Sequence, residues 1–480
     1  LKKYWINKKP MLKKLFSKFE KNKNNIALID LDGYEYSYKD IIDKNKYIAS
    51  KLKKNSLAIL ICSNSADSII VYTTLLKFNV LVLLLDESFD KEYIKSVIKK
   101  FKPQYIFKPK NFHTRDFTNF ESNLISLKSY DIFKTNYKKF SYNKKNYLLL
   151  TTSGSTHNPK FVRLSAENIK NNSDSIIDYL KIKKNYATIT TMPMGYSYGL
   201  SILNTYLEAG AKIILNKDSV FEKNFWEKIN KYKINSLNGV PQFYELLKKI
   251  NFHKFNLKYL KYITQAGGKL DKEVLVYLKD LSKNKLIDLF IMYGQTEASP
   301  RMSYLKIDKK NKSKISSIGR SLKNSKFKLI DEKGNNVTKT NKVGEIIYYG
   351  KNVCLGYANT RNDLNRGDIN KGILLTGDLA YRDKENFYYL VGRKNRISKI
   401  FGIRVNLEDI EKKLLKSGIK IKCETDDKFL SILSTKSNDE NKIKELIQKN
   451  YKINKNYIKF RYCYKINKKN LFKELQEKIR

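Results

Sequence analysis

Thr151–Lys160 reads TTSGSTHNPK and directly follows the apolar run Tyr147–Leu150. Small hydroxyl side chains around a glycine leave backbone N–H groups and hydroxyls free to wrap phosphate oxygens, and the lysine adds a positive charge. The segment is not a Walker loop, because no Gly-Lys-Ser/Thr follows at the required spacing. Taken alone, it fits a phosphate-binding loop and a Ser/Thr-rich surface turn equally well.

Two later segments carry groups suited to the rest of a nucleotide. Tyr293–Glu297 (YGQTE) follows the predicted strand Ile287–Met292. It places an aromatic ring, a hydroxyl and a carboxylate at a strand end, where a base, a phosphate and Mg²⁺ can use them. Thr376–Asp378 follows the apolar run Ile373–Leu375 and offers a carboxylate for ribose hydroxyls, while Arg393 can bind ribose or phosphate. Together the segments favour a nucleotide site.

Short apolar runs alternate with longer amphipathic stretches from Leu57 onward, beginning with Leu57–Cys62, Ser68–Phe78 and Val80–Leu85. This alternation is typical of a parallel sheet covered by helices. From about Asn324, short strands and turns predict a β-rich subdomain of about residues 324–392. We therefore predict a multidomain protein of α/β and α+β class. A large N-terminal domain of stacked sheets and helices spans residues 1–392, and a small α+β C-terminal domain spans residues 393–480.

The formal net charge of +49 would normally indicate a polyanionic partner. The lysines are spread along the whole chain, however, and arginine, the preferred reader of bases, is scarce by comparison. We therefore expect no nucleic acid as the primary partner. A strongly positive surface still attracts acidic substrates or an acidic protein.

Cysteine and histidine usage disfavours disulfide and metal chemistry. None of the three histidines has metal-ligand spacing, and no CxxC pair occurs among the four cysteines, Cys62, Cys354, Cys423 and Cys463. We expect free thiols in a reducing compartment. No apolar run reaches membrane-spanning length, and Leu1–Lys14 lacks the long apolar core of a secretory signal. The expected location is the cytoplasm, without a membrane span.

With these segments in this order, the chain resembles the AMP-forming acyl and aryl ligases of the adenylate-forming (ANL) superfamily, closest in texture to the acyl-CoA synthetases. The resemblance extends over nearly the whole chain. Further matching segments are Tyr34–Ile41, Leu57–Ser63, Leu76–Asp86, Met192–Leu200 (MPMGYSYGL), Asn238–Pro241, Ala266–Leu270 (AGGKL), Gly344–Glu345, Gly356–Tyr357 and Gly392–Glu411. Any one of them fits chance or simple packing, whereas their ordered conjunction does not.

The resemblance implies that ATP and Mg²⁺ are used to convert a carboxylic acid into an acyl-adenylate with release of pyrophosphate. The implied contacts to the ATP phosphates come from Thr152, Ser153, Gly154, Ser155, Thr156 and Lys160. Those to adenine and ribose come from Gly267, Gly268, Tyr293, Asp378 and Arg393, with Gln295 and Arg404 completing the ATP-binding set. Thr296 is implied to contact the α-phosphate and Glu297 to hold Mg²⁺. No nucleophilic side chain is needed, because the substrate carboxylate attacks the α-phosphorus in line.

In the family a second half-reaction delivers the acyl group to a thiol, after a mobile C-terminal domain rotates about a hinge residue, here Asn395. The thiol belongs to coenzyme A or to phosphopantetheine on an acyl carrier protein. No carrier segment is evident in the chain, so a carrier would be a separate protein, and an acidic one would suit the basic C-terminal region.

The resemblance also implies a substrate pocket, containing Tyr196, Tyr198, Gly199 and Asn238. The segment Met192–Leu200 has no acidic residue to hold an amino group. Fatty, aryl or hydroxy acids are therefore favoured over α-amino acids as the small-molecule substrate.

The sequence departs from the family pattern at several positions. His157 and Phe161 stand where the family has glycines, Tyr196 replaces the histidine of the pocket segment, and Asn395 replaces the hinge Asp or Lys. The first two restrict backbone freedom without removing a phosphate ligand. Asn395 still tolerates unusual backbone angles.

The largest departure is at the C-terminus. The family's catalytic lysine lies in a Pro-x-Thr-x-x-Gly-Lys motif, whereas Tyr464–Leu475 reads YKINKKNLFKEL, with neither Pro nor Gly. Lys469 matches best, but Lys465, Lys468 and Lys473 lie beside it, and a solvated basic helix face is the other interpretation. An alternative function is therefore a degenerate, non-catalytic member that binds nucleotide as a scaffold or sensor.

Overall fold

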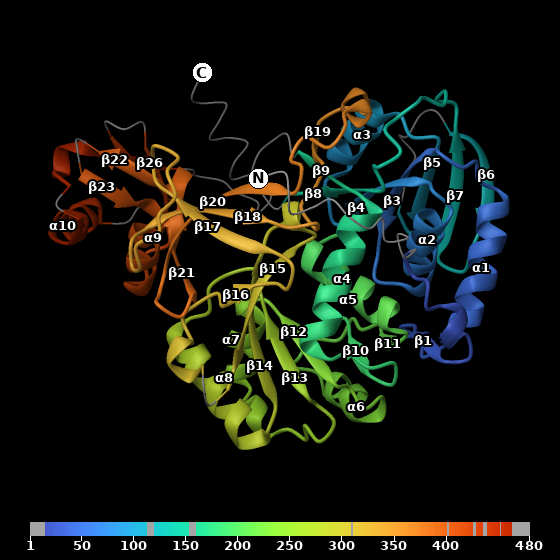
Figure 1. Ribbon diagram of the computed structural model, residues 1–480, viewed down its shortest axis with the longest axis horizontal. Coiled ribbons are helices and arrows are strands. Elements are labelled where there is room, and N and C mark those ends of the chain that lie inside the picture. The colour runs from blue at the N-terminus through green and yellow to red at the C-terminus, as the bar shows by residue number, and fades with distance from the viewer. Residues whose placement is uncertain are drawn as a thin grey trace. The chain divides into compact units, whose positions relative to one another are not determined.

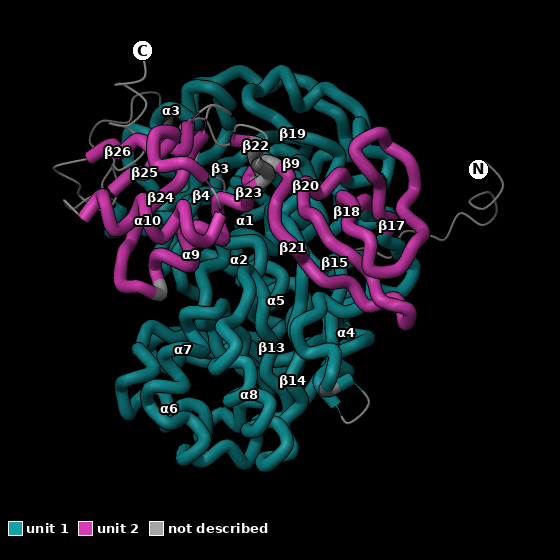
Figure 2. Tube along the Cα trace, turned by 90° about the vertical axis from the view of Figure 1, so that its left-hand side faces the viewer, with its two compact units in different colours: residues 1–153, 159–327, 348–374 teal, residues 154–158, 328–347, 375–480 magenta. Residues whose placement is uncertain are grey.

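The computed structural model describes residues 15–112, 120–152, 160–308, 311–400, 403–425, 429–434, 439–451 and 453–462. The chain divides into two compact units, which are coloured separately in Figure 2. Unit 1 comprises Leu1–Ser153, Pro159–Phe327 and Tyr348–Leu374, and unit 2 comprises Gly154–Asn158, Lys328–Ile347 and Leu375–Arg480. The boundary of a mobile domain at residues 392–393 stays a prediction.

Two large sheets form the framework of unit 1 (Figure 1). The nine-stranded sheet has the spatial order β16 (Arg320–Ser321), β15 (Arg301–Ile307), β14 (Asp288–Gly294), β13 (Tyr262–Gln265), β12 (Ser236–Gly239), β10 (Ala187–Ile189), β11 (Lys212–Ile214), β1 (Ile26–Ile29) and β2 (Glu35–Ser37). The eight-stranded sheet has the order β19 (Gly356–Ala358), β9 (Phe161–Leu164), β8 (Leu148–Thr151), β4 (Leu81–Asp86), β3 (Leu57–Cys62), β5 (Tyr105–Pro109), β7 (Tyr130–Thr135) and β6 (Phe120–Ser126). Strands β10 to β14 pair in parallel in the first sheet, as do β3, β4, β5 and β8 in the second. The predicted parallel core, and with it the α/β fold class, is confirmed.

Helices cover both sheets of unit 1. They are α1 (Tyr38–Ser50), α2 (Ala66–Lys77), α3 (Lys91–Phe101), α4 (Ala166–Leu180), α5 (Ser197–Ala209), α6 (Lys223–Lys231), α7 (Pro241–Lys249) and α8 (Lys272–Lys285). One apolar core combines residues of both sheets with residues of α1, α2, α4 and α5. These four helices therefore pack against both sheets in this shared core, and α4 lies beside α5 (Figure 1).

Strand β3 shows why the second sheet is built from continuous apolar runs. Its residues Leu57, Ile59 and Ile61 join a core that includes α3, and the residues between them join the core that includes α2. Successive side chains of a strand point to opposite faces, so both faces of β3 must be apolar. Each fully buried Leu or Ile contributes about 1.5–3 kcal/mol relative to an exposed one.

Unit 2 contains most of a smaller sheet and the C-terminal α+β part. The four-stranded sheet has the order β17 (Lys326–Ile330), β18 (Gly344–Tyr349), β20 (Ile373–Arg382) and β21 (Tyr388–Arg393). A hairpin of β22 (Ile397–Ile400) and β23 (Ile403–Asn406) follows, then α9 (Leu407–Lys416), α10 (Glu440–Tyr451) and a three-stranded sheet of β24 (Lys422–Thr425), β25 (Leu430–Ser434) and β26 (Ile458–Tyr462). A separate apolar core joins α9 and α10 to this sheet.

Two global properties follow from the described residues. Over these ranges, no helix has both the length and the apolar character needed to cross a bilayer. Cys62, Cys354 and Cys423 are buried free thiols. Burial raises the pKa of Cys354 and Cys423 to about 12, so both thiols are protonated and unreactive at neutral pH.

Candidate active site

The predicted Tyr293–Glu297 segment ends β14 and turns into the short 3-10 helix η3 (Thr296–Ala298). The turn is tight. The Gln295 N–H donates to the Pro300 carbonyl oxygen (2.9 Å), and a β-carbon at Gly294 would lie only 1.9 Å from that same oxygen. Only glycine fits position 294, because any side chain would collide with the backbone of the returning chain.

Two buried asparagine amides fix the backbone around η3. The Asn172 side chain on α4 donates to the carbonyl oxygens of Ala298 (3.3 Å) and Arg301 (2.8 Å). The Asn352 side chain donates to the same two oxygens, at 2.6 Å and 2.8 Å. Because buried carbonyl groups are costly to leave unpaired, these four bonds hold the segment that carries Glu297 in one conformation.

Glu297, Tyr357 and Lys160 form a cluster at this turn. The Tyr357 hydroxyl donates to Glu297 Oε1 (2.8 Å), and Lys160 Nζ lies 5.7 Å from the centre of the Tyr357 ring. Burial, together with the neighbouring carboxylate, raises the pKa of Tyr357, so the phenol stays protonated and donates to Glu297. The cluster holds one carboxylate and one cation, and its Lys160 is the last residue of the predicted phosphate-loop segment.

The ends of that loop are brought together by pairing of β8 with β9, in which Thr151 lies opposite Phe161. The Thr152 N–H donates to the Lys160 carbonyl oxygen (3.4 Å), and the Lys160 side chain is exposed. The predicted phosphate ligands Ser153, Gly154, Ser155 and Thr156 lie outside the described residues, as does His157.

Mg²⁺ fits this cluster without a dedicated protein cage. Among the described residues there is no group of three or more His, Cys, Asp or Glu side chains that would hold a metal. Mg²⁺ is commonly bound by one or two carboxylates together with substrate phosphates, so the single carboxylate of Glu297 is a suitable protein ligand.

The predicted adenine-side loop lies beside Tyr196. Gly267 has φ of +84°, and a β-carbon there would lie 2.6 Å from the Tyr196 hydroxyl. The Gln265 side chain donates to the Gly268 carbonyl oxygen (2.7 Å), which fixes the loop. Gly267 and Gly268 are both exposed, so a planar base can approach their backbone. Tyr293 is buried, with its ring 6.2 Å from that of Phe327.

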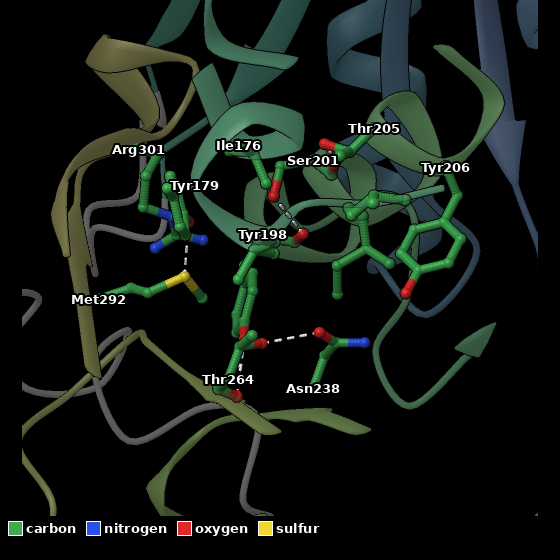
Figure 3. Close-up of a pocket in the computed structure, with 13 residues that line it drawn as sticks. Ile176, Tyr179, Tyr198, Ser201, Thr205, Tyr206, Asn238, Thr264, Met292 and Arg301 are labelled. Carbon is green, nitrogen blue, oxygen red and sulfur yellow. Dashed lines mark hydrogen bonds between the residues drawn. The ribbon is translucent and has the colours of Figure 1, made fainter. Parts of the chain in front are cut away.

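The predicted pocket residues Tyr198 and Asn238 line a cavity of about 20 Å³ between α4, α5 and strands β12 to β15 (Figure 3). Its floor is a hydrogen-bond chain. The Tyr198 hydroxyl lies 2.7 Å from Thr264 Oγ1, and Thr264 Oγ1 donates to Asn238 Oδ1 (2.7 Å). Burial raises the pKa of Tyr198 to about 12, with Arg301 opposing the rise. Arg301 was not among the residues predicted from the sequence.

One further predicted residue, Thr296, links η3 to the start of α5, and another, Gly199, lies within α5. The Thr296 hydroxyl donates to Ser197 Oγ (3.1 Å), and Ser197 begins α5 directly before Tyr198. Gly199 does not line the cavity. Its place in α5 has a packing reason, because a β-carbon there would lie 2.2 Å from the Pro193 carbonyl oxygen.

Unit 2 holds the predicted ribose-binding pair. Asp378 on β20 lies opposite Arg393 on β21, and Arg393 Nε donates to Asp378 Oδ1 (3.1 Å). The Thr376 hydroxyl accepts from the Asp378 N–H (3.1 Å) and donates to the Ile346 carbonyl oxygen (2.8 Å). Asp378 is buried and Arg393 is exposed. The carboxylate is therefore held rigidly, while the guanidinium group paired with it is open to solvent.

The remaining predicted residues give no side-chain geometry. Asn395 belongs to the short 3-10 helix η6 (Lys394–Arg396) and Arg404 to β23, but their side chains are outside the described part of the chain. Lys469 also lies outside the described residues. Next to the predicted hinge residue, Lys394 donates to Glu345 Oε2 (2.8 Å), and this bond raises the pKa of Lys394.

Comparison with solved structures identifies the fold. The structure of o-succinylbenzoate CoA synthetase from Bacillus subtilis, in complex with its acyl-adenylate intermediate, superposes with a TM-score of 0.74 over 94% of this chain and 95% of that chain, at 19% identity. The sequence model of the AMP-binding enzyme family matches residues 15–358. The chain therefore belongs to the AMP-binding enzyme family.

Curated relatives agree with this assignment. "Probable 4-coumarate–CoA ligase 1" of Dictyostelium discoideum is 32% identical over 270 residues, covering 55% of this chain and 48% of that protein. D-alanine–D-alanyl carrier protein ligase of Bacillus licheniformis is 26% identical over 275 residues, covering 55% and 54%. The chain thus spans about half the length of these relatives.

Proposed function

We propose that this protein activates a carboxylic acid with ATP to an acyl-adenylate, releases pyrophosphate, and transfers the acyl group to a thiol of coenzyme A or of a carrier protein. The observation that supports this most is the cluster in which Tyr357 of β19 contacts both Lys160 and the Glu297 carboxylate of the rigid η3 turn. A carboxylate and a cation held beside a Ser/Thr-rich loop are the groups that phosphoryl and nucleotidyl transfer requires. Family membership and relatives that act on CoA and on a carrier protein support the same reaction.

The residue roles in this proposal are those that the family resemblance implies. Thr152 and Lys160, with the loop between them, bind the ATP phosphates, and Gly267, Gly268 and Gln295 frame the base with Tyr293. Asp378, Arg393 and Arg404 bind the ribose. Bound Mg²⁺ would supply charge neutralisation at the phosphates, and Glu297 would hold it. Thr296 donates to the α-phosphate as the substrate carboxylate attacks and pyrophosphate leaves.

The thiol step involves the C-terminal part of the chain. We propose Asn395 as the hinge and Lys469 as the lysine that meets the adenylate, in a protein of the cytoplasm. An acidic carrier protein would be attracted by the net charge of +49. A fall in carrier acylation with salt, without a matching fall in CoA acylation, would favour the carrier as acceptor.

The test is ATP–pyrophosphate exchange with a panel of fatty, aryl, hydroxy and short carboxylic acids. Exchange with at least one acid, lost on Glu297→Gln, supports the proposal. Glu35→Gln, at an exposed glutamate on β2, is the matched control and should keep full exchange. ATP binding by calorimetry without exchange for any acid would instead support a nucleotide-binding scaffold or sensor.

A further inference from the structure

Arg301 is brought into the cavity by a break in strand register. From Leu289↔Ile307 to Tyr293↔Ser303, strands β14 and β15 pair in steps of one residue, but Gly294 then pairs with Arg301. The extra residue on β15 is a β-bulge, which turns the following side chain to the other face of the sheet. Arg301 therefore takes the face of Tyr304, which packs against the core containing α4 and α5.

The guanidinium of Arg301 is almost fully buried and has no acidic partner. The residue is 2% exposed, its Nε has no hydrogen-bond partner, and no carboxylate of the described residues forms an ion pair with it. Its guanidinium carbon lies 4.9 Å from the centre of the Tyr198 ring, and it also faces the Tyr179 phenol (Figure 3). Aromatic faces offset only part of the cost of burying a cation.

Arg163, another fully buried arginine of unit 1, shows how the terminal nitrogens of a structural arginine are satisfied, although its Nε, like that of Arg301, has no hydrogen-bond partner. Its terminal nitrogens donate to three backbone carbonyls, those of Leu355 (3.0 Å), Arg366 (2.6 Å) and Gly367 (3.0 Å). Arg163 thereby joins β9 to the segment around β19. Within the described residues, the Arg301 side chain forms no such set of hydrogen bonds to backbone carbonyls, so bonds of this kind do not explain its burial.

The residues that line the cavity with Arg301 adjoin those of the proposed reaction centre. Arg301, Tyr198 and Asn238 all line the cavity, and Tyr198 follows Ser197, which accepts from the Thr296 hydroxyl. The backbone of Arg301 is fixed as well, since its carbonyl accepts from two asparagine amides and its N–H donates to Asn172 Oδ1 (3.3 Å). A volume of about 20 Å³ admits a compact polar group but not a long chain.

We propose that Arg301 is a specificity-determining residue that selects short carboxylic acids carrying a second anionic group, such as a dicarboxylic acid. This rests on the proposed function, because the first carboxylate is the one that reacts at the α-phosphate. The second carboxylate would complete the unmet pairing of a buried, permanently charged guanidinium, which binds carboxylates through two parallel hydrogen bonds. A hydroxyl group on the acid would accept one hydrogen bond from Arg301 but would leave its positive charge unneutralised. An anionic group is therefore the expected ligand.

The test compares acids of equal chain length, with and without the second carboxylate: butanedioate against butanoate, and pentanedioate against pentanoate. We expect the wild-type protein to show at least about tenfold higher kcat/KM in ATP–pyrophosphate exchange for the dicarboxylate of a pair. Arg301→Met should abolish this preference. Arg301→Lys keeps the positive charge but loses the two parallel N–H donors of the guanidinium, and it should retain part of the preference. Arg320→Met, at an exposed arginine on the neighbouring strand β16, is the control and should leave the preference unchanged.

Equal kcat/KM for both members of each pair in the wild-type protein overturns the proposal, whatever the variants do, and leaves the proposed function standing. If no acid supports exchange, the proposed function fails, and calorimetric titration of butanedioate decides the role of Arg301. Binding to the wild-type protein that Arg301→Met removes, with unfolding temperature retained, supports the anion site. Absence of binding to the wild-type protein overturns it.

Discussion

Replacing Tyr357 by phenylalanine tests the Glu297 cluster by removing a single hydroxyl. The phenol donates to Glu297 Oε1 at 2.8 Å, while the ring lies beneath Lys160 Nζ at 5.7 Å. Phenylalanine keeps the ring, and therefore the contact with Lys160, but cannot donate a hydrogen bond. Any change in the rate of adenylation then shows how much the hydrogen bond from Tyr357 contributes by orienting the Glu297 carboxylate.

The size of the effect follows from the exposure of Tyr357. A hydrogen bond to a charged group contributes about 1.5–3 kcal/mol when it is well shielded. Tyr357 is 38% exposed, so solvent screening reduces this contribution to about 1 kcal/mol. We expect a five- to tenfold lower kcat in adenylation (about 1–1.4 kcal/mol in the activation barrier). We also expect a higher Mg²⁺ concentration for half-maximal rate, since a free carboxylate pays more entropy on binding the ion.

The assay is ATP–pyrophosphate exchange at saturating acid, with Mg²⁺ varied, on wild-type protein, Tyr357→Phe and Tyr34→Phe. Tyr34 is an exposed tyrosine next to β2, so its variant controls for loss of a surface phenol. The unfolding temperature of each variant should stay within a few degrees of wild type. Unchanged kcat and unchanged Mg²⁺ dependence in Tyr357→Phe would show that this bond does not position Glu297 for the reaction.

Three further outcomes are expected. Arg163→Met removes three hydrogen bonds to backbone carbonyls, two of them only partly buried, and should lower the free energy of unfolding by about 2–4 kcal/mol, measured by urea denaturation. Burial raises the pKa of Glu208 despite Lys170 at 3.3 Å, so its stabilising contribution is complete below the pKa of the unfolded chain and is lost as pH rises through the folded pKa. The unfolding temperature of Glu208→Gln relative to wild type should therefore increase as the pH rises above the ordinary glutamate pKa of 4.5, and a constant difference contradicts this. Asp378→Asn weakens the pair with Arg393 and should raise the KM for ATP about tenfold with little change in unfolding temperature.

The framework of unit 1 was predictable because it depends on local patterns. The run Leu57–Cys62 is apolar at every position, as a strand buried on both faces must be, and the structure places it in the middle of a parallel sheet. Glu297 was also predictable as a candidate, because a carboxylate directly after a buried strand lies at a sheet edge. Whether it binds Mg²⁺ stays a prediction.

The partners of Glu297 were not predictable from local sequence. Tyr357 reaches it because β19 pairs with β9, an association between segments far apart in the chain, in which Tyr357 lies opposite Val162. Asn172 looks like an ordinary polar residue of α4 in the sequence, and only the packing of α4 against the η3 turn gives its amide two carbonyls to bind. Such contacts depend on tertiary structure and leave no periodic signal.

The sequence contains one indication that Arg301 is unusual. An arginine at the start of a strand that is apolar at four of its seven positions is unusual, since arginine is rarely buried without a partner. Its direction, however, depends on the register shift after Tyr293, and without that shift the same side chain would point away from α4 and α5. A one-residue irregularity therefore decides whether the charge faces the cavity.

The same hydrogen bonds position the two side chains to which we assign functions, Glu297 and Arg301. Asn172 and Asn352 each donate to the carbonyls of both Ala298 and Arg301, so the turn bearing Glu297 and the start of β15 bearing Arg301 are fixed by one set of amides. Glu297 acts in the proposed adenylation and Arg301 in the proposed selection of the acid. Because they share a rigid support, the distance between the reacting carboxylate and a second anionic group is set by the protein and not by loop motion. If Arg301 binds the second carboxylate, the fixed backbone of residues 297–301 should also make one of the two dicarboxylates, butanedioate or pentanedioate, the better substrate, since one length satisfies both ends better than the other.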